Sequence, residues 1–354
     1  MHPAEPLIGQ YDTALFDLDG VIYLGPVAVP TAPPTMAELR ARRTQVGFVT
    51  NNAGRRPETV AEHLRELGID ADASDVVTSA QAVAHLLADR FPPGSPVLVL
   101  GAESLVHELT TRAGLRIVDS PDDGPVAVVQ GLNADMTWLQ LCDAAAAIHA
   151  GAVWYATNTD TTRPTPRGNL PGCGAAVQAM QLAVEPEPIV AGKPYPPLMV
   201  ETLERLGGKR SIFVGDRVDT DVAGANAVGI DSLMVLSGAH GPADLLTAPP
   251  ELRPTHLGRD VSALLEPART VGLAPGAAVC RDQRVELADG RYRWSGSAGS
   301  PYAWLDAVWA LAQLHWAEGA AVGASPGPLL DQLGPMPQQE PEPQQEPMPQ
   351  EVPQ

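Results

Sequence analysis

The chain has 354 residues, enough for two or three domains, and 44% of them are hydrophobic, which supports a packed core and excludes global disorder. Its 42 acidic residues outnumber 23 basic ones, and a formal net charge of −19 should repel phosphate backbones and anionic lipids. No apolar run is long enough to cross a bilayer, and the first residues lack a secretory signal pattern. The three cysteines are too widely spaced for a disulfide framework or a metal motif. We therefore expect a cytoplasmic protein that neither binds nucleic acid nor inserts into membranes.

Short apolar segments alternate with helical patterns as far as about residue 265. Apolar strands that alternate with helices are typical of a parallel sheet covered on both faces. The pattern therefore predicts an α/β fold. The expected strands are 13–16, 45–49, 97–100, 126–129, 153–156, 211–214 and 233–236, and the expected helices include 35–43 and 57–67.

The pattern changes after about residue 266. Residues 285–294 predict a hairpin that turns at Asp289 and Gly290. Residues 301–316 predict one amphipathic helix. Its apolar side would carry Trp304, Val308, Leu311 and His315. We expect a small α+β appendage over 267–330 and a disordered, acidic Pro/Gln/Glu-rich tail over 331–354.

Two carboxylates follow the first expected strand in the motif DLDG. Asp17 and Asp19 are one residue apart, and Gly20 permits a tight turn after them. Ligands of α/β sheets bind beyond the carboxyl ends of the strands, so both acids should reach one small site. Neighbouring carboxylates repel each other and need a cation or a proton to coexist. Because oxygen ligands suit Mg²⁺, the motif predicts a magnesium site.

A second acidic motif, GDRVDTD, follows the expected strand 211–214. Asp216 would lie near the carboxyl end of its strand, as Asp17 lies directly after the expected strand 13–16. Asp221 lies five residues further on and could orient Lys193 or a metal-bound water. Two parallel strands that end in acids and face each other would form a divalent-cation site.

Two further motifs carry groups that suit a phosphoryl group. Thr50, Asn51 and Asn52 supply a hydroxyl, amides and backbone N–H groups where a strand leads into a helix. Lys193 precedes a proline turn and supplies a positive charge for phosphate oxygens. Each of the four motifs is common in turns when it occurs alone. Here all four occur in order, each directly after an expected strand, which argues against coincidence.

The motifs DLDG, TNN, GKP and GDRVDTD together resemble the four motifs of the haloacid dehalogenase (HAD) superfamily. The string DLDGVIYLG from Asp17 and the loop TNTD from Thr157 are similar to its NagD-like branch, subfamily IIA. The resemblance implies a Rossmann-like parallel-sheet core with an inserted α/β cap of the C2 type. The implied division is a core of residues 1–80 and 184–266 and a cap of residues 81–183.

The resemblance also implies a Mg²⁺-dependent phosphatase that works through an aspartyl-phosphate. Asp17 would be the nucleophile and a metal ligand. Asp19 would act as the general acid and base and bind the metal through its backbone carbonyl, and Asp216 would complete the protein ligands. The phosphoryl group would be held by Thr50, Asn51, Asn52 and Lys193.

The appended segment and the tail resemble those of actinobacterial members described as glycerol-3-phosphate phosphatases. A small phosphorylated metabolite is therefore the expected substrate, glycerol 3-phosphate first and phosphoglycolate next. Caps of this branch often dimerise, so the resemblance leaves a homodimer open.

The alternative is a phosphoryl-accepting signalling module of the receiver type, which also combines strand-end aspartates with a threonine and a lysine. Two features argue against it. A receiver accepts the phosphoryl group on a lone aspartate, whereas Asp19 here adds a second acid. A receiver also lacks an insertion as long as the one between Thr50 and Lys193.

Overall fold

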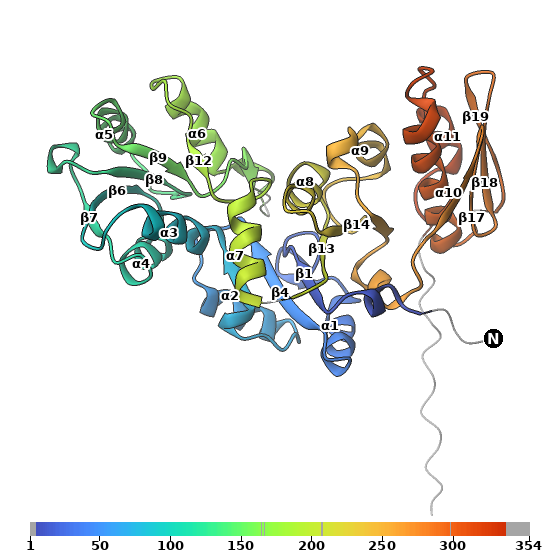
Figure 1. The fold of residues 1–354 in the computed structure, drawn as a ribbon, viewed down its shortest axis with the longest axis horizontal. Coiled ribbons are helices and arrows are strands. Elements are labelled where there is room, and N and C mark those ends of the chain that lie inside the picture. The colour runs from blue at the N-terminus through green and yellow to red at the C-terminus, as the bar shows by residue number, and fades with distance from the viewer. Residues whose placement is uncertain (1–4, 164, 166, 207, 298, 338–354) are drawn as a thin grey trace, which may run out of the picture. The chain divides into compact units, whose positions relative to one another are not determined.

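The computed structural model describes residues 5–163, 165, 167–206, 208–297 and 299–337. It divides after Ala268 into two compact units (Figure 1). All four motifs lie in the first unit, and the appendage forms the second.

Six parallel strands form the main sheet of the first unit, in the order β15-β14-β13-β1-β4-β5. In this sheet Phe16 lies opposite Phe48 on one side and Val214 on the other. Every residue of β1 and β13 is buried. The expected α/β class is therefore confirmed. The strands are β1 (Thr13–Phe16), β4 (Gln45–Thr50), β5 (Val76–Thr78), β13 (Ser211–Gly215), β14 (Asp231–Val235) and β15 (His256–Gly258).

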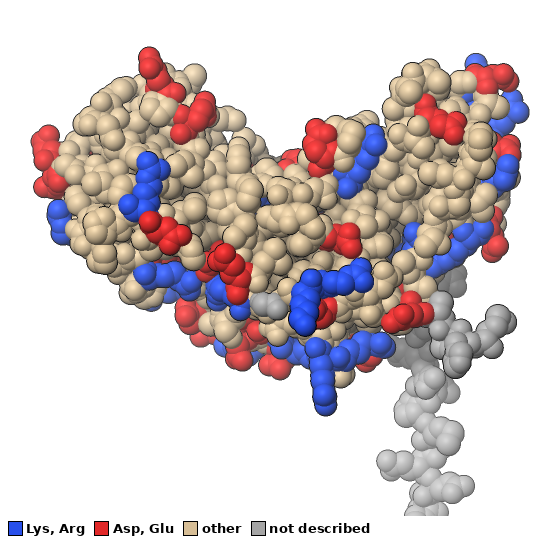
Figure 2. All heavy atoms as spheres, viewed as in Figure 1, with Lys and Arg blue, Asp and Glu red and all other residues tan. Residues whose placement is uncertain are grey.

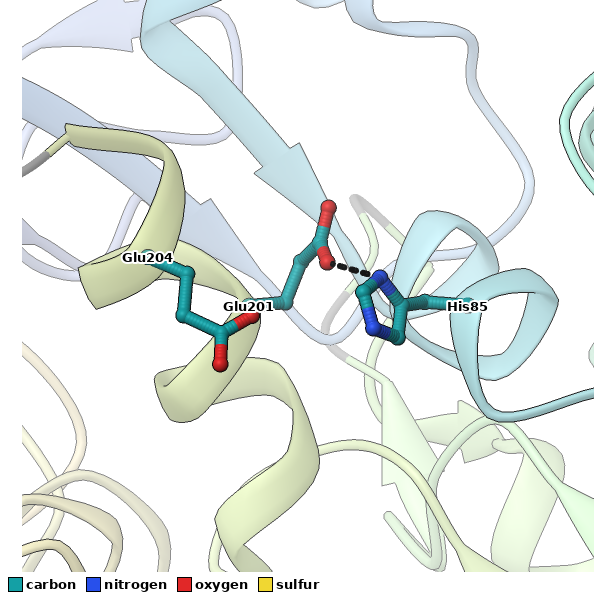
Figure 3. Close-up of side chains that lie close together, drawn as sticks. All are labelled: His85, Glu201 and Glu204. Carbon is teal, nitrogen blue, oxygen red and sulfur yellow. Dashed lines mark ion pairs between the residues drawn. The ribbon is translucent and has the colours of Figure 1, made fainter. Parts of the chain in front are cut away.

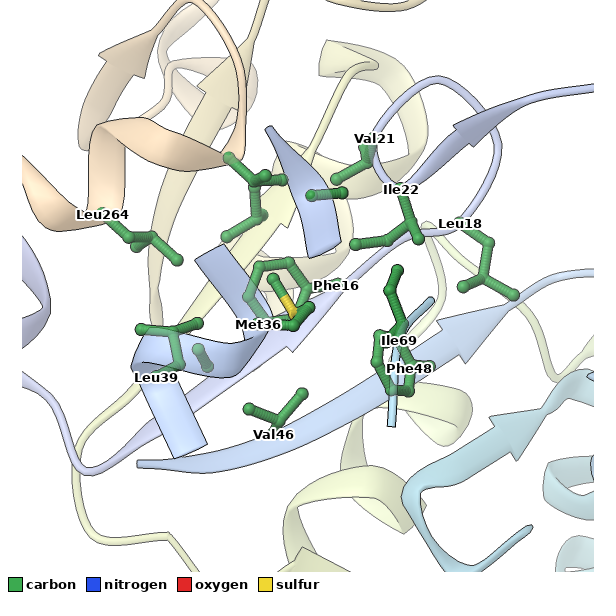
Figure 4. Close-up of a cluster of buried hydrophobic side chains, with 14 of the residues drawn as sticks. Phe16, Leu18, Val21, Ile22, Met36, Leu39, Val46, Phe48, Ile69 and Leu264 are labelled. Atoms are coloured by element: carbon green, nitrogen blue, oxygen red, sulfur yellow. The ribbon is translucent and has the colours of Figure 1, made fainter. Parts of the chain in front are cut away.

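One face of this sheet is closed by an apolar cluster in which Met36 and Leu39 of one helix approach Phe16 and Val46 (Figure 4). That helix begins three residues earlier than expected. Prolines fit the first helical turn, where their missing N–H groups are not needed. The helices of this region are α1 (Ala32–Ala41), α2 (Pro57–Glu66), α7 (Pro196–Leu206), α8 (Ala223–Ala227) and α9 (Pro242–Thr247). The other elements here are the strands β2 (Tyr23–Leu24) and β3 (Val27–Ala28) and the helical turns η1 (Leu7–Gln10), η2 (Ala73–Asp75), η4 (Val218–Val222), η5 (Pro250–Leu252) and η6 (Val261–Leu265).

A second parallel sheet is inserted between β5 and α7, with the strand order β12-β9-β8-β6-β7. The strand at Ile189–Val190 pairs with this sheet, so the sheet extends beyond residue 183. Its strands are β6 (Pro96–Leu100), β7 (Arg116–Val118), β8 (Ala127–Gln130), β9 (Val153–Ala156) and β12 (Ile189–Val190). The remaining elements are α3 (Ser79–Arg90), α4 (Glu103–Thr111), η3 (Pro121–Asp123), α5 (Trp138–His149), α6 (Cys173–Gln181), β10 (Thr162–Arg163) and β11 (Leu170–Pro171).

The two sheets of the first unit share one continuous apolar interior. A single cluster joins Leu15 and Phe213 of the main sheet to Val97 and Val129 of the inserted sheet, with Val83 of α3 between them. Burial of apolar surface is the main favourable contribution to folding. The inserted sheet is therefore packed on the main one and not only tethered to it.

The second unit is a four-stranded antiparallel sheet with two helices. Its hairpin turns at Asp289 and Gly290 as expected, with φ of 54° and 70°, which suit this pair. The expectation of an amphipathic helix is wrong, because Leu305 and Trp309, off the expected apolar side, are also buried. The elements are β16 (Val271–Ala274), β17 (Ala277–Cys280), β18 (Gln283–Ala288), β19 (Arg291–Ser295), α10 (Pro301–Leu314), η7 (His315–Gly319) and α11 (Gly327–Leu333).

The start of the expected acidic tail belongs to an ordered element, since helix α11 continues to Leu333. Residues 338–354, where most of that prediction falls, lie outside the described residues. Among the residues that are described, no helix combines the length and the apolar character needed to cross a membrane.

Candidate active site

The carboxyl ends of β1, β4 and β13 lie side by side in the main sheet, and the loop after β12 joins them. A cavity of about 440 Å³ opens at this edge. Residues at the end of the main sheet and residues of the inserted region line it. All eight predicted site residues lie in its wall: Asp17, Asp19, Thr50, Asn51, Asn52, Lys193, Asp216 and Asp221.

Lys193 is the centre of the charged groups. Its ammonium donates to Asp17 Oδ1 at 2.6 Å and to Asp221 Oδ1 at 2.7 Å, and it lies 5.0 Å from the centre of the Phe213 ring. The side chain is only 2% exposed. Burial alone would lower the pKa of Lys193, but the two carboxylates raise it above its ordinary value. The lysine therefore stays charged and holds Asp17 in place.

Asp221 uses both carboxylate oxygens within the protein. While Oδ1 accepts from Lys193, Oδ2 accepts the backbone N–H groups of Asp216 and Arg217, each at 3.1 Å. With these bonds made, Asp221 has little capacity left to bind a metal ion. That Asp221 orients Lys193 or a metal-bound water stays a prediction, and its contact with Lys193 is consistent with it.

Asp216 has one free oxygen. Its Oδ2 accepts the N–H of Ala239 at 2.5 Å, whereas the buried Oδ1 has no hydrogen-bond partner among the described residues. Carboxylate oxygens of Asp17, Asp216 and Asp221 lie within 4.8 Å of one another. A buried carboxylate oxygen without a partner is costly unless a cation faces it. These oxygen donors fit Mg²⁺.

The acids of the site are hard to ionise together. Burial raises the pKa of Asp17 well above its ordinary value, and the neighbouring Asp221 and Asp216 raise it further. Burial and the charge of Asp221 raise the pKa of Asp216 to about 7. Burial also raises the pKa of Asp19, although its side chain reaches solvent at the cavity mouth. Lys193 alone does not balance these charges, so the site favours a divalent cation or protons.

The three residues after β4 have different contacts. Thr50 Oγ1 accepts the N–H of Asn52 at 3.1 Å, and Asn52 Oδ1 accepts the N–H of Gly54 at 2.8 Å, which shapes the loop. The side chain of Asn51 instead faces the backbone of Lys193 and the carboxylate of Asp160, in the loop after β9. A phosphate-binding role for the three stays a prediction.

Several wall residues were not among the predicted site residues: Leu24, Leu132, Asn158, Asp160, Arg163 and Arg217. Asn158 and Asp160 follow β9 in the sequence TNTD, much as Asn51 follows β4 in TNN. A Thr-Asn pair directly after an apolar strand is therefore the sequence signal that could have identified Asn158 and Asp160. Leu24 and Leu132 are apolar, and an apolar residue in the sequence predicts burial but not a place in the cavity wall.

A second group of metal-ligating side chains lies away from this cavity (Figure 3). Figure 3 shows His85 of α3 beside Glu201 and Glu204 of α7. The buried Glu201 already accepts from His85 Nδ1 at 2.8 Å and from Arg112 Nη1 at 3.0 Å. Because its oxygens are taken by a ring nitrogen of His85 and the guanidinium of Arg112, we interpret the cluster as polar contacts that tie α3, α7 and the end of α4 together.

A Glu201→Gln variant should therefore lose about 1.5–3 kcal/mol of unfolding free energy, the range for hydrogen bonds to charged groups. Turnover should stay unchanged, because the cluster does not line the cavity. Chemical denaturation of this variant and of Glu204→Gln, a change at an exposed position of the same helix, provides the comparison. Stabilisation by Zn²⁺ that disappears in Glu201→Gln would instead indicate a metal site.

Two family models match the chain. One, described as haloacid dehalogenase-like hydrolase, covers residues 14–115, and the other, described as HAD-hydrolase-like, covers residues 190–264. D-glycerol 3-phosphate phosphatase of Mycobacterium tuberculosis is 46% identical over 266 residues, which are 75% of this chain and 74% of that protein. Acid sugar phosphatase of Staphylococcus aureus is 38% identical over 65% of this chain and 88% of its own length.

Solved structures show the same likeness. The crystal structure of glycerol phosphate phosphatase from Mycobacterium tuberculosis in complex with magnesium has a TM-score of 0.79 and 39% identity, and the match covers 88% of this chain and 92% of that one. NagD from E. coli K-12 has a TM-score of 0.65 and 30% identity over 71% of this chain and 97% of its own. The match to the Mycobacterium tuberculosis structure covers more residues than the first unit contains, so it extends into the second unit. These relatives do not favour the receiver-type alternative, and the chain belongs to the haloacid dehalogenase-like hydrolases.

Proposed function

We propose that this protein is a Mg²⁺-dependent phosphatase that hydrolyses glycerol 3-phosphate through an aspartyl-phosphate on Asp17. The observation that carries the proposal is the position of Asp17, bound by Lys193 at 2.6 Å in a cavity that it shares with the partnerless Oδ1 of Asp216. The likeness to glycerol 3-phosphate phosphatase supports the choice of substrate.

The metal would be held by carboxylate oxygens of Asp17 and Asp216 and by the backbone carbonyl of Asp19. When bound, Mg²⁺ supplies positive charge that offsets the repulsion between the attacking carboxylate and the phosphate dianion. Lys193 contributes fixed positive charge to the same end. We propose that the hydroxyl of Thr50 and the backbone N–H groups of Asn51 and Asn52 orient the phosphoryl oxygens.

The chemistry takes two steps. In the first, an oxygen of Asp17 bonds to phosphorus while the bond from phosphorus to the ester oxygen breaks, and Asp19 gives its proton to the departing alkoxide. In the second, Asp19 takes a proton from water as that water attacks phosphorus, which releases phosphate and restores Asp17. The raised pKa of Asp19 suits a group that must begin as an acid.

Residues 81–183 would act as a cap over this site, since Leu132 and Asp160 of the inserted region line the cavity. A cavity of about 440 Å³ suits a small ester, with phosphoglycolate as the next substrate after glycerol 3-phosphate. On the face shown in Figure 2, basic side chains lie among acidic ones, which supports a small-molecule partner and not a nucleic acid. We further propose that the enzyme is cytoplasmic, with its three cysteines free.

The test is a comparison of phosphate release from phosphorylated metabolites at fixed Mg²⁺. Glycerol 3-phosphate should give the highest kcat/KM, followed by phosphoglycolate. A sugar phosphate that exceeds both would contradict the substrate, and a single equivalent of phosphate per chain would contradict the enzyme class.

Asp19→Asn tests the acid and base. With glycerol 3-phosphate the turnover should fall by about 10²–10⁴-fold, because the alkoxide no longer receives a proton. With p-nitrophenyl phosphate the first step should slow much less, because nitrophenolate leaves without a proton; burst kinetics separates the two steps. Mg²⁺ binding should persist, since Asp19 would bind through its backbone. An equal loss of the first step with both esters would contradict this assignment.

A further inference from the structure

Three separate stretches of chain meet at the side chain of Asn51. Its Nδ2 donates to the backbone oxygen of Lys193 at 3.0 Å and to Asp160 Oδ2 at 3.2 Å, and its Oδ1 accepts the N–H of Lys193 at 2.8 Å. Lys193 is 142 residues away in the sequence and Asp160 is 109 residues away. The amide thus joins the loop after β4, the loop after β9 and the loop after β12.

The orientation of this amide follows from its surroundings. If it were turned over, its oxygen would face both the carbonyl of Lys193 and the carboxyl of Asp160, which are acceptors. In the observed orientation, both N–H groups and the oxygen are bonded. The backbone oxygen of Asn51 is held as well, by Asn158 Nδ2 at 2.7 Å and by Ser79 Oγ at 2.6 Å.

The loops after β9 and β12 lie close together beside Asn51. A side chain at Gly192 would come within 2.7 Å of Asn51 Oδ1 and within 2.5 Å of the backbone oxygen of Thr157. A glycine is needed at Gly192 because the loops after β9 and β12 approach so closely. A shift of the loop that carries Asp160 would therefore also move the backbone of Lys193.

We propose that Asn51 is a positioning residue that couples the inserted domain to the phosphoryl site. Asp160 holds the amide of Asn51, the amide holds the backbone of Lys193, and Lys193 holds Asp17. The inference deepens the proposed function and rests on it. It assigns the side chain of Asn51 to the alignment of Lys193 and not to direct contact with phosphate. It also predicts that Asp160 contributes to the affinity for phosphate.

The competing explanation is that Asp160 only contacts the alcohol part of the substrate. Inorganic phosphate separates the two ideas, because it occupies the phosphoryl site and has no alcohol part. Titration calorimetry with inorganic phosphate and Mg²⁺ measures this affinity without turnover. We expect Asp160→Ala to weaken phosphate binding by about 10–150-fold, the loss of one hydrogen bond to a charged group. Asp160→Asn, which keeps an acceptor oxygen, should recover most of the affinity.

Leu132→Ala is the matched control. Leu132 also belongs to the inserted domain and lines the cavity, but its side chain is apolar. This variant should raise the KM for glycerol 3-phosphate and leave the affinity for inorganic phosphate unchanged.

A double-mutant cycle tests whether Asp160 acts through Asn51. In an Asn51→Ala background, Asp160→Ala should have little further effect on phosphate binding, because the link is already broken. Additive effects would overturn the proposal. So would an Asp160→Ala variant that binds phosphate within twofold of the parent while its KM for the ester rises. If no ester is hydrolysed but the cycle still shows coupling, the proposed function fails and the link through Asn51 stands.

Discussion

An Asp17→Asn variant should fold normally and lose more than about 10⁴-fold in turnover, the scale seen when a catalytic nucleophile is removed. The amide keeps the size and shape of the carboxylate but cannot attack phosphorus. Asp17 lies at the end of β1, where its Oδ1 is held by Lys193, so no neighbouring group replaces it. Both oxygens of Asp221 are taken by other contacts, and the partnerless oxygen of Asp216 is the one proposed to face the metal.

Turnover of glycerol 3-phosphate, followed with a phosphate assay, measures the loss, and circular dichroism checks the fold. Asp12→Asn is the matched control because Asp12 precedes the same strand at its other end and is exposed. That variant should keep its turnover. If Asp17→Asn retained more than about 1% of the parent rate, Asp17 would not be the nucleophile.

The sequence predicts the central strands well because their apolar runs are continuous. The segments at 13–16, 153–156 and 211–214 are strands as expected, within one residue. The short edge strand β7 escapes the same reasoning, because its three residues are too few for a pattern. Burial of α10 on more than one side was missed because Leu305 and Trp309 do not follow the expected helical stripe.

The sequence predicts the site less completely than it predicts the central strands. Carboxyl ends of neighbouring parallel strands meet at one edge, so strand-end motifs indicate which residues share the cavity. The sequence does not indicate how each side chain is used. The amide of Asn51 faces Asp160 and the backbone of Lys193, and only the fold brings partners so distant in sequence together. Asp221 differs, because the sequence already suggested that it orients Lys193, and only its bonds to two backbone N–H groups needed the fold.

Magnesium should stabilise the protein, and the effect should depend on pH. Without metal, the pKa of Asp216 is raised to about 7. The folded chain then binds a proton that the unfolded chain, with an ordinary carboxyl pKa, has released. Stability of the metal-free protein should therefore fall as the pH rises from about 4 to 7. Metal binding displaces the proton, so Mg²⁺ affinity should weaken by about tenfold per pH unit below 7.

Thermal unfolding at pH 6 and pH 8, with and without Mg²⁺, measures this linkage. A ligand that binds only the folded state raises the Tm by an amount that grows with the logarithm of its affinity, so the rise should be larger at pH 8. Asp216→Asn should remove most of the rise and make the metal-free protein less sensitive to pH over this range. Asp219→Asn is the control, since Asp219 is exposed and pairs with Arg217. An equal rise at both pH values, or a rise that survives in Asp216→Asn, would mean that Mg²⁺ does not bind at the partnerless oxygen of Asp216.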